Sequence, residues 1–196
     1  MNSKKILFML AAIFMLAFDI SATPTDIAPA APAAIDSNQA QVAPSQVDYW
    51  LSKLTVEEKI GQLLMPRLPW RAKNVDAKIR DLLKTVPVGG IALFRDNVET
   101  IPQVQALTKD LQTLARVPLF IAMDEEGGRV SRIGRLFDKA TPPAFDIGAK
   151  GDSTVAYNTA RTIGQRLTQL GVNMNFAPIA DIWSNPANTV IGNRAF

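Results

Sequence analysis

Cysteine and histidine are both absent from the 196 residues. Without cysteine there can be no disulfide bond, thiol catalysis or cysteine-bound metal. Without histidine, a Ser-His-Asp triad, acid–base catalysis by imidazole and most zinc sites are excluded. The glycine-rich patterns that cradle nucleotide phosphates are missing too. We therefore expect no metal and no cofactor, and any chemistry must depend on carboxylates, arginines, lysines or hydroxyl groups.

An excess of one charge is also lacking, because the formal net charge is only +3. No run of basic residues with interleaved aromatics occurs, so the sequence predicts no nucleic-acid partner. Apolar residues make up 47% of the chain, which is enough to build a core, and the length suits one domain.

Only one long apolar run is present, and it lies at the N-terminus. Lys4 and Lys5 precede an almost wholly apolar stretch, 6–18, and small residues follow at Ser21 and Ala22. This pattern predicts a secretory signal over residues 1–22 and an exported protein, periplasmic or secreted. The run is shorter than the ~20 residues of a membrane span, so we expect none after cleavage, with an uncleaved anchor as the alternative.

The rest of the chain divides into a linker and a folded domain. Residues 23–45 are rich in alanine and proline and offer little bulky apolar surface, which predicts a linker. Residues 46–196 carry helical and strand patterns in alternation. We expect helices over 47–54, 55–63, 74–83, 101–114 and 153–170, and strands over 63–65, 88–94, 118–123 and 172–178, with a loop over 134–151.

Three of the expected helices carry capping signals, and Asp152 or Ser153 is the expected cap of the helix over 153–170. Thr55 stands three residues before Glu58, the spacing of a capping box. Asn74 is the expected cap of the third helix. Alternating strands and helices imply a parallel sheet, either open and doubly wound or part of an eight-stranded barrel.

Polar residues follow three of the expected strands. Asp124 and Glu125 end a buried strand, Arg95 and Asp96 end another, and Asp181 follows the last. A barrel gathers such strand ends around one mouth, where ligands bind. The sequence therefore favours the barrel and predicts a polar ligand site there.

Four ordered blocks resemble glycoside hydrolase family 3. The segment 54–63 resembles the opening helix of that family, and 89–94 resembles its second strand. Residues 124–132 (DEEGGRVSR) resemble its D-x-E-G-G-R-V-x-R signature. Residues 175–181 and 185–196 resemble the next signature, in the form typical of the β-N-acetylhexosaminidase branch.

This resemblance implies a (β/α)8 TIM-barrel fold, of which about the first half is present. It implies retaining hydrolysis of terminal β-linked N-acetylglucosamine, with Asp124, Arg132 and Arg194 binding the sugar. Carboxylates and arginines suit that task, because they form charge-assisted hydrogen bonds to hydroxyl groups.

The reacting groups of the family are not matched in this chain. The acid–base Asp–His pair and the nucleophilic aspartate follow the Arg194 motif in the family, so we expect no catalytic residue here. Alternatives are a non-catalytic saccharide-binding or scaffold remnant, a β-glucosidase-type member of the family, and completion of the barrel by a second chain.

Five further side chains carry weaker expectations. Glu126 is expected to brace Arg129 in a structural ion pair. Asn173 and Asn175 alternate on a strand, and at least one should form hydrogen bonds within the barrel. Trp183 is the tryptophan best placed to stack on a sugar.

Overall fold

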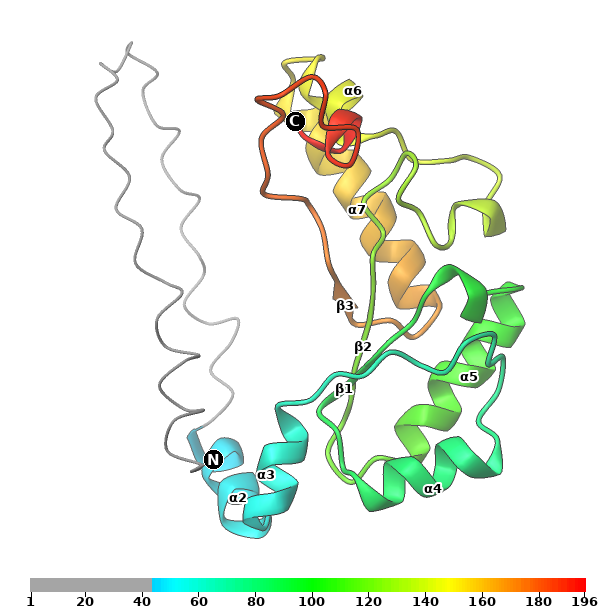
Figure 1. Ribbon diagram of the computed structural model, residues 1–196, viewed down its shortest axis with the longest axis vertical. Coiled ribbons are helices and arrows are strands. Elements are labelled where there is room, and N and C mark those ends of the chain that lie inside the picture. Colours follow the sequence, from blue (N-terminus) through cyan, green and yellow to red (C-terminus); the bar gives the residue numbers. More distant parts are fainter. Residues whose placement is uncertain (1–43) are drawn as a thin grey trace. The chain divides into compact units, whose positions relative to one another are not determined.

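The computed structural model describes residues 44–196, nearly all of them in the unit Gln46–Phe196 (Figure 1). The predicted signal, 1–22, lies outside the described residues, as does all but the end of the predicted linker. Ordered structure begins earlier than expected, because helix α2 starts at Pro44. Within residues 44–196, no helix is long and apolar enough to cross a membrane.

A parallel sheet lies at the centre of the unit, with its strands in chain order. The strands are β1 (Gly90–Ala92), β2 (Phe120–Met123) and β3 (Met174–Asn175). Ile91 lies opposite Ile121. The expected first strand, 63–65, is replaced by a slightly later extended segment, which runs parallel to β1 through a bridge between Arg67 and Ala92. A doubly wound sheet reverses its strand order at a switch point. The described sheet shows no such reversal, as expected for an open part of a (β/α)8-type barrel.

Helices connect and flank the strands. They are α2 (Pro44–Lys53), α3 (Val56–Gln62), α4 (Ala77–Thr85), α5 (Ile101–Leu114), α6 (Ala144–Gly148) and α7 (Ser153–Gln169). Side chains cap the starts of α3, α4, α5 and α7. The capping box is confirmed, because Thr55 and Glu58 each accept a hydrogen bond from the other's backbone N–H. The predicted cap at Asn74 is wrong. Asp76 caps α4 instead, with Oδ1 accepting from the N–H of Ile79 at 2.8 Å.

The expected loop over 134–151 contains structure that the sequence pattern did not reveal. A 3-10 turn spans Gly134–Leu136, and α6 follows Pro143. Ala144 and Ile147 of α6 are buried, and α6 packs on α7 and on the 3-10 turn Gly192–Arg194. So short a helix has little intrinsic stability, and it depends on these tertiary contacts.

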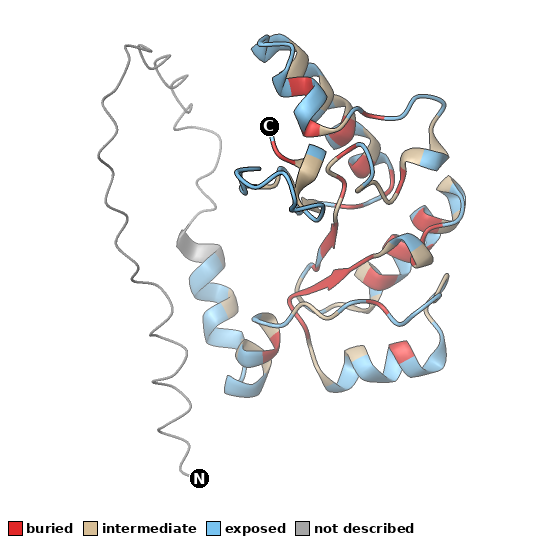
Figure 2. Ribbon diagram, turned by 45° about the horizontal axis from the view of Figure 1, so that its top comes forward, coloured by how far each residue is buried: buried red, intermediate tan, exposed pale blue. Residues whose placement is uncertain are grey.

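The core lies between the sheet and the inner faces of α5 and α7. Figure 2 shows the strands buried and the outer helix surfaces exposed. Many of the completely buried side chains come from β2, α5 and the end of α7; they include Ile121, Val104, Leu111 and Leu170. The helical spacing predicted for 101–114 thus directs one face of α5 onto the sheet.

The apolar side chains of α2 and α3 are exposed within the described unit. Val47 and Leu51 are each 52% exposed, and Leu63, just after α3, is 85% exposed. Both helices form where the sequence predicted them, but nothing among residues 44–196 covers these side chains.

Candidate functional site

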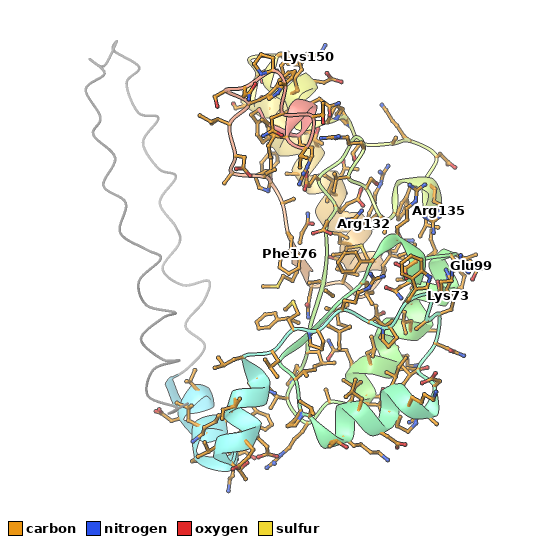
Figure 3. The ribbon with its side chains drawn as sticks, viewed as in Figure 1. Lys73, Glu99, Arg132, Arg135, Lys150 and Phe176 are labelled. Carbon is orange, nitrogen blue, oxygen red and sulfur yellow. The ribbon has the colours of Figure 1, made fainter. Side chains whose placement is uncertain are left out.

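Asp124 follows the last residue of β2 and forms an ion pair with Arg132. Arg132 Nη2 lies 2.6 Å from Asp124 Oδ2, and the two side chains are 22% and 27% exposed. Figure 3 shows Arg132 beside the loop that leaves β2. The structure therefore brings together two of the three residues predicted to bind a sugar.

A tight turn returns the chain so that Arg132 reaches Asp124. Gly127 and Gly128 both have positive φ, at 89° and 54°. Glu126 N–H donates to Val130 O at 2.9 Å, closing the turn. A Cβ at Gly127 would lie 2.4 Å from Pro142 O, so both the backbone conformation and the space require glycine.

Glu125 binds the end of this turn, at residues 131–133. Its side chain is 1% exposed. Oε1 accepts from the Ser131 hydroxyl at 2.6 Å, and Oε2 accepts from the backbone N–H groups of Arg132 at 2.7 Å and Ile133 at 3.1 Å. Glu125 thus fixes the backbone that carries Arg132 and serves the loop rather than a ligand.

Asn173 and Asn175 tie β3 to the two ends of β2. Asn175 Oδ1 accepts from Glu125 N–H at 2.9 Å, and its Nδ2 donates to Glu125 O at 3.0 Å. Asn173 makes the same pair of bonds with Ile121 N–H and Leu119 O. Both side-chain amides therefore extend the hydrogen bonding of the sheet. This confirms the expectation that at least one of these asparagines forms hydrogen bonds within the barrel. Asn175 also fixes the backbone next to Asp124.

Arg194 pairs with Glu126 instead of lying free. Arg194 Nε lies 2.8 Å from Oε2 of Glu126, and Nη2 lies 2.7 Å from Oε1. This bidentate hydrogen bonding raises the pKa of the Arg194 guanidinium; burial opposes the shift, while the negative charges of Asp124 and Asp181 reinforce it. Because Glu126 lies in the loop that follows Asp124, this ion pair attaches Arg194 to the same loop after β2.

The predicted pairing of Glu126 with Arg129 is wrong. Arg129 Nη2 donates to the backbone carbonyls of Val190 and Ile191. Arg129 and Arg194 therefore both attach the segment before residue 196 to the turn after β2.

Phe94, at the end of β1, is a part of the site that sequence reasoning missed. The Arg132 guanidinium carbon lies 5.5 Å from its ring centroid, and that of Arg67 lies 4.5 Å from it. The ring thus stacks with two cations. Arg132 Nε is buried and has no hydrogen-bond partner within the described chain, which leaves a donor at the site unsatisfied.

Asp181 and Trp183 lie on the exposed segment after β3. Trp183 is 41% exposed and packs edge-on against Phe145, with ring centroids 6.2 Å apart. Its stacking on a sugar stays a prediction.

Between β3, α7 and Arg194 lies a cavity of about 470 Å³, with an apolar wall from α7. Residues 44–196 contain no carboxylate cluster placed to hold a metal ion.

Asp96 fixes the segment that passes beside β1. Its Oδ1 pairs with Arg67 Nη2 at 2.7 Å, and its Oδ2 accepts from Arg71 N–H at 2.7 Å. Burial pushes the pKa of the Asp96 carboxyl upward. The hydrogen bond from Arg71 N–H and the charge of Arg67 outweigh burial and hold the pKa below its usual 3.8.

The lowered pKa predicts that Asp96 loses its stabilising effect in acid. Its contribution is complete above about pH 3.8 and is lost as pH falls through the lower folded-state value. We expect Asp96→Asn to lower the free energy of unfolding by up to about 1 kcal/mol at neutral pH and by less near pH 3. Urea unfolding at both pH values measures this difference. An equal loss at both would show that the carboxylate charge is not involved.

A paired carboxylate and arginine at the carboxyl ends of parallel barrel strands define an α/β-barrel ligand site. The glycosyl hydrolase family 3 N terminal domain matches residues 55–196. The chain belongs to this family, which confirms both the predicted resemblance and the barrel fold class.

Several relatives are β-hexosaminidases. Beta-hexosaminidase A of Pseudoalteromonas piscicida is 37% identical over 73% of this chain and 28% of its own length. Beta-hexosaminidase LpqI of Mycobacterium tuberculosis is 31% identical over 90% of this chain and 43% of its own. The chain thus spans less than half the length of these curated relatives.

Solved structures agree with this assignment. A family 3 beta-N-acetylglucosaminidase from Paenibacillus sp. str. FPU-7 is 40% identical, with a TM-score of 0.66 over 72% of this chain and 27% of that one. NagZ from Neisseria gonorrhoeae is 32% identical, with a TM-score of 0.60 over 67% and 39%.

Proposed function

We propose that residues 55–196 form the sugar-binding part of a glycosidase that acts by retaining hydrolysis on terminal β-linked N-acetylglucosamine. The observation that carries this proposal is the Asp124–Arg132 pair at the end of β2. Arg132 holds Asp124 Oδ2, while no hydrogen bond among residues 44–196 occupies Oδ1. That oxygen can accept from a sugar hydroxyl.

Arg194 completes the proposed site. Its bidentate pair with Glu126 fixes the guanidinium on the same rim, and among residues 44–196 its Nη1 donates only to Val190 O, at 3.1 Å. The relatives that are beta-N-acetylglucosaminidases or beta-hexosaminidases support the choice of sugar.

We also propose that the groups that break the glycosidic bond are supplied by residues other than these 196. A retaining glycosidase needs an acid–base group and a nucleophile, commonly two carboxyl groups about 5 Å apart. The three carboxylates after β2 are engaged otherwise, with Glu125 in three loop bonds, Glu126 paired with Arg194 and Asp124 paired with Arg132. The signal-like segment 1–22 supports export, so we place the substrate outside the cytoplasm.

Binding of N-acetylglucosamine to the purified 196-residue chain tests the sugar site. We expect Asp124→Asn to weaken binding at least about 10-fold, because the amide loses the charge that strengthens hydrogen bonds to hydroxyls. Asp146→Asn, at an exposed position on α6, is the matched control and should bind as the unaltered chain does. Equal binding by the two variants, measured by calorimetry, would refute the assignment of Asp124.

A separate assay tests the missing chemistry. The purified chain alone is expected to leave a chromogenic β-N-acetylglucosaminide uncleaved. Cleavage that Asp124→Asn abolishes would disprove the proposal that the reacting groups lie elsewhere.

A further inference from the structure

Trp70 lies at the same end of the parallel strands as Asp124. The extended segment 66–68 runs parallel to β1 through the bridge between Arg67 and Ala92. Trp70 comes soon after this segment, as Asp124 comes directly after β2. Because the carboxyl ends of parallel strands share one edge of a sheet, both residues belong to the same rim of the barrel.

A tight turn carries Trp70 at its tip. Ala72 N–H donates to Pro69 O at 3.1 Å, which closes the turn. Trp70 and Arg71 are therefore its two central residues. The side-chain amide of Asn97, which is completely buried, donates to Pro69 O at 3.0 Å and to Ala72 O at 3.1 Å. Both ends of the turn are thus fixed to the interior of the unit.

Arg71, the residue after Trp70, has a backbone conformation that residues other than glycine seldom adopt. Its φ is +58°, and no other non-glycine residue among 44–196 has a positive φ. Such a conformation persists only where the surroundings hold it, and it occurs preferentially at functional sites. Asp96 holds it here, because its Oδ2 accepts from Arg71 N–H at 2.7 Å. The turn that presents Trp70 is therefore both strained and fixed.

The Trp70 ring remains accessible although two cations contact it. The guanidinium carbons of Arg67 and Arg71 lie 5.5 and 6.0 Å from its centroid. Cation–π contacts of this length attract the ring and limit its rotation. Because Trp70 is still 68% exposed, these contacts leave most of the indole uncovered. Trp70 thus offers a flat aromatic surface in a fixed position.

A row of stacked groups joins Trp70 to the proposed sugar site. The Arg67 guanidinium that contacts Trp70 also lies 4.5 Å from the Phe94 centroid. Arg132 stacks on the same phenyl ring at 5.5 Å and pairs with Asp124 at 2.6 Å. Because Arg132, Phe94 and Arg67 stand between them, a sugar held by Asp124 does not itself cover Trp70. The next unit of a saccharide would reach it.

From this geometry we infer that Trp70 is a stacking platform for the sugar unit next to the terminal one. The face of an aromatic ring is negative, and the C–H groups of a pyranose face carry partial positive charge, so the two faces attract. The inference rests on the proposed function, because Asp124 must hold the terminal sugar. It specifies a saccharide of at least two units as the preferred ligand, recognised by a ring face and not by charge.

Calorimetric titration of the 196-residue chain with N-acetylglucosamine and with its β-1,4-linked dimer, N,N′-diacetylchitobiose, tests the platform. We expect the dimer to bind at least about 5-fold more tightly than the monosaccharide. Trp70→Ala should remove this gain and leave monosaccharide binding within about 2-fold. Trp70→Phe keeps an aromatic face and should restore part of the gain, whereas Trp70→Leu keeps only apolar bulk and should not.

An exposed aromatic residue on α2 provides the matched control. Tyr49→Ala should keep the full gain from the dimer, because Tyr49 belongs to α2 and not to the rim. Equal affinity of the unaltered chain for the two ligands would overturn the platform, as would a gain that Trp70→Ala retains. A gain lost in Trp183→Ala alone would assign the stacking to Trp183 instead.

Tryptophan fluorescence provides a second readout, because the chain has only three tryptophans. The dimer should shift the emission to shorter wavelength by removing water from Trp70, and the monosaccharide should leave it unchanged. The shift should be absent from Trp70→Phe. A shift of equal size in that variant would overturn the inference.

Asp124→Asn separates this inference from the proposed function. The variant should weaken both ligands at least about 10-fold, because Asp124 holds the terminal sugar of each. Monosaccharide binding that depends on Asp124, with no gain from the dimer, would refute the platform alone. A gain that depends on Trp70, in a chain whose binding Asp124→Asn leaves intact, would refute the role of Asp124 alone.

Discussion

Glu125→Ala is expected to lower the free energy of unfolding of the described unit by about 3–5 kcal/mol. The side chain is completely enclosed and accepts three hydrogen bonds, from the Ser131 hydroxyl and from the N–H groups of Arg132 and Ile133. Alanine would remove both acceptor oxygens and leave a cavity. The two backbone donors would then be buried without partners, which costs more than the net value of the bonds themselves.

The same substitution should also release Arg132 from Asp124. Glu125 holds the backbone of Arg132, so its loss should weaken N-acetylglucosamine binding without removing a proposed sugar contact. Glu125→Gln keeps the shape and one acceptor oxygen, and should therefore restore most of the stability. Glu57→Ala removes an exposed glutamate from α3 and should change stability by less than about 0.5 kcal/mol. Urea unfolding measures the free energy of unfolding of all three variants. A loss with Glu125→Ala no larger than with Glu57→Ala would refute the bracing role.

The helices of the fold were largely predictable because local signals and burial agree. The boundaries of α5 match the predicted 101–114, since Thr100 caps the start and Val104, Leu107 and Leu111 all face the core. At α4 the local capping signal and the burial pattern disagree. Asn74 and Asp76 are both good capping residues, and the position of the buried Ile79 decides in favour of Asp76, whose carboxylate reaches the Ile79 N–H.

The site was predictable only where its partners are close in sequence. Asp124 and Arg132 are eight residues apart, and the two glycines between them predict the turn that brings the two side chains together. The same closeness in sequence predicts that Glu126 pairs with Arg129, and this prediction is wrong. The true partner of Glu126, Arg194, lies 68 residues later, and only the return of the chain past β3 brings it back.

Gly89→Ala is the second substitution with a large expected effect, a loss of about 3 kcal/mol in the free energy of unfolding. A Cβ at Gly89 would lie 2.0 Å from Gln62 O and 2.8 Å from the Gln62 carbonyl carbon. Both are backbone atoms, so no side-chain rotation relieves the clash. Gly89 N–H also donates to Gly61 O and Leu64 O, and Gly89 O accepts from Phe120 N–H at 2.9 Å. Any shift of Gly89 therefore disturbs the start of β1, the end of α3 and the pairing with β2 together.

Gly164→Ala provides the opposite case on the same chain. Gly164 lies inside α7, and a Cβ there would meet nothing within 4 Å. Alanine has a higher helix propensity than glycine, so we expect a gain of about 0.5–1 kcal/mol. Urea unfolding of both variants compares the same chemical change in two environments. If Gly89→Ala were as stable as Gly164→Ala, α3 could not lie against β1 as described. Opposite signs would show that the close approach of Gln62 to Gly89, and not glycine itself, fixes this junction of the barrel.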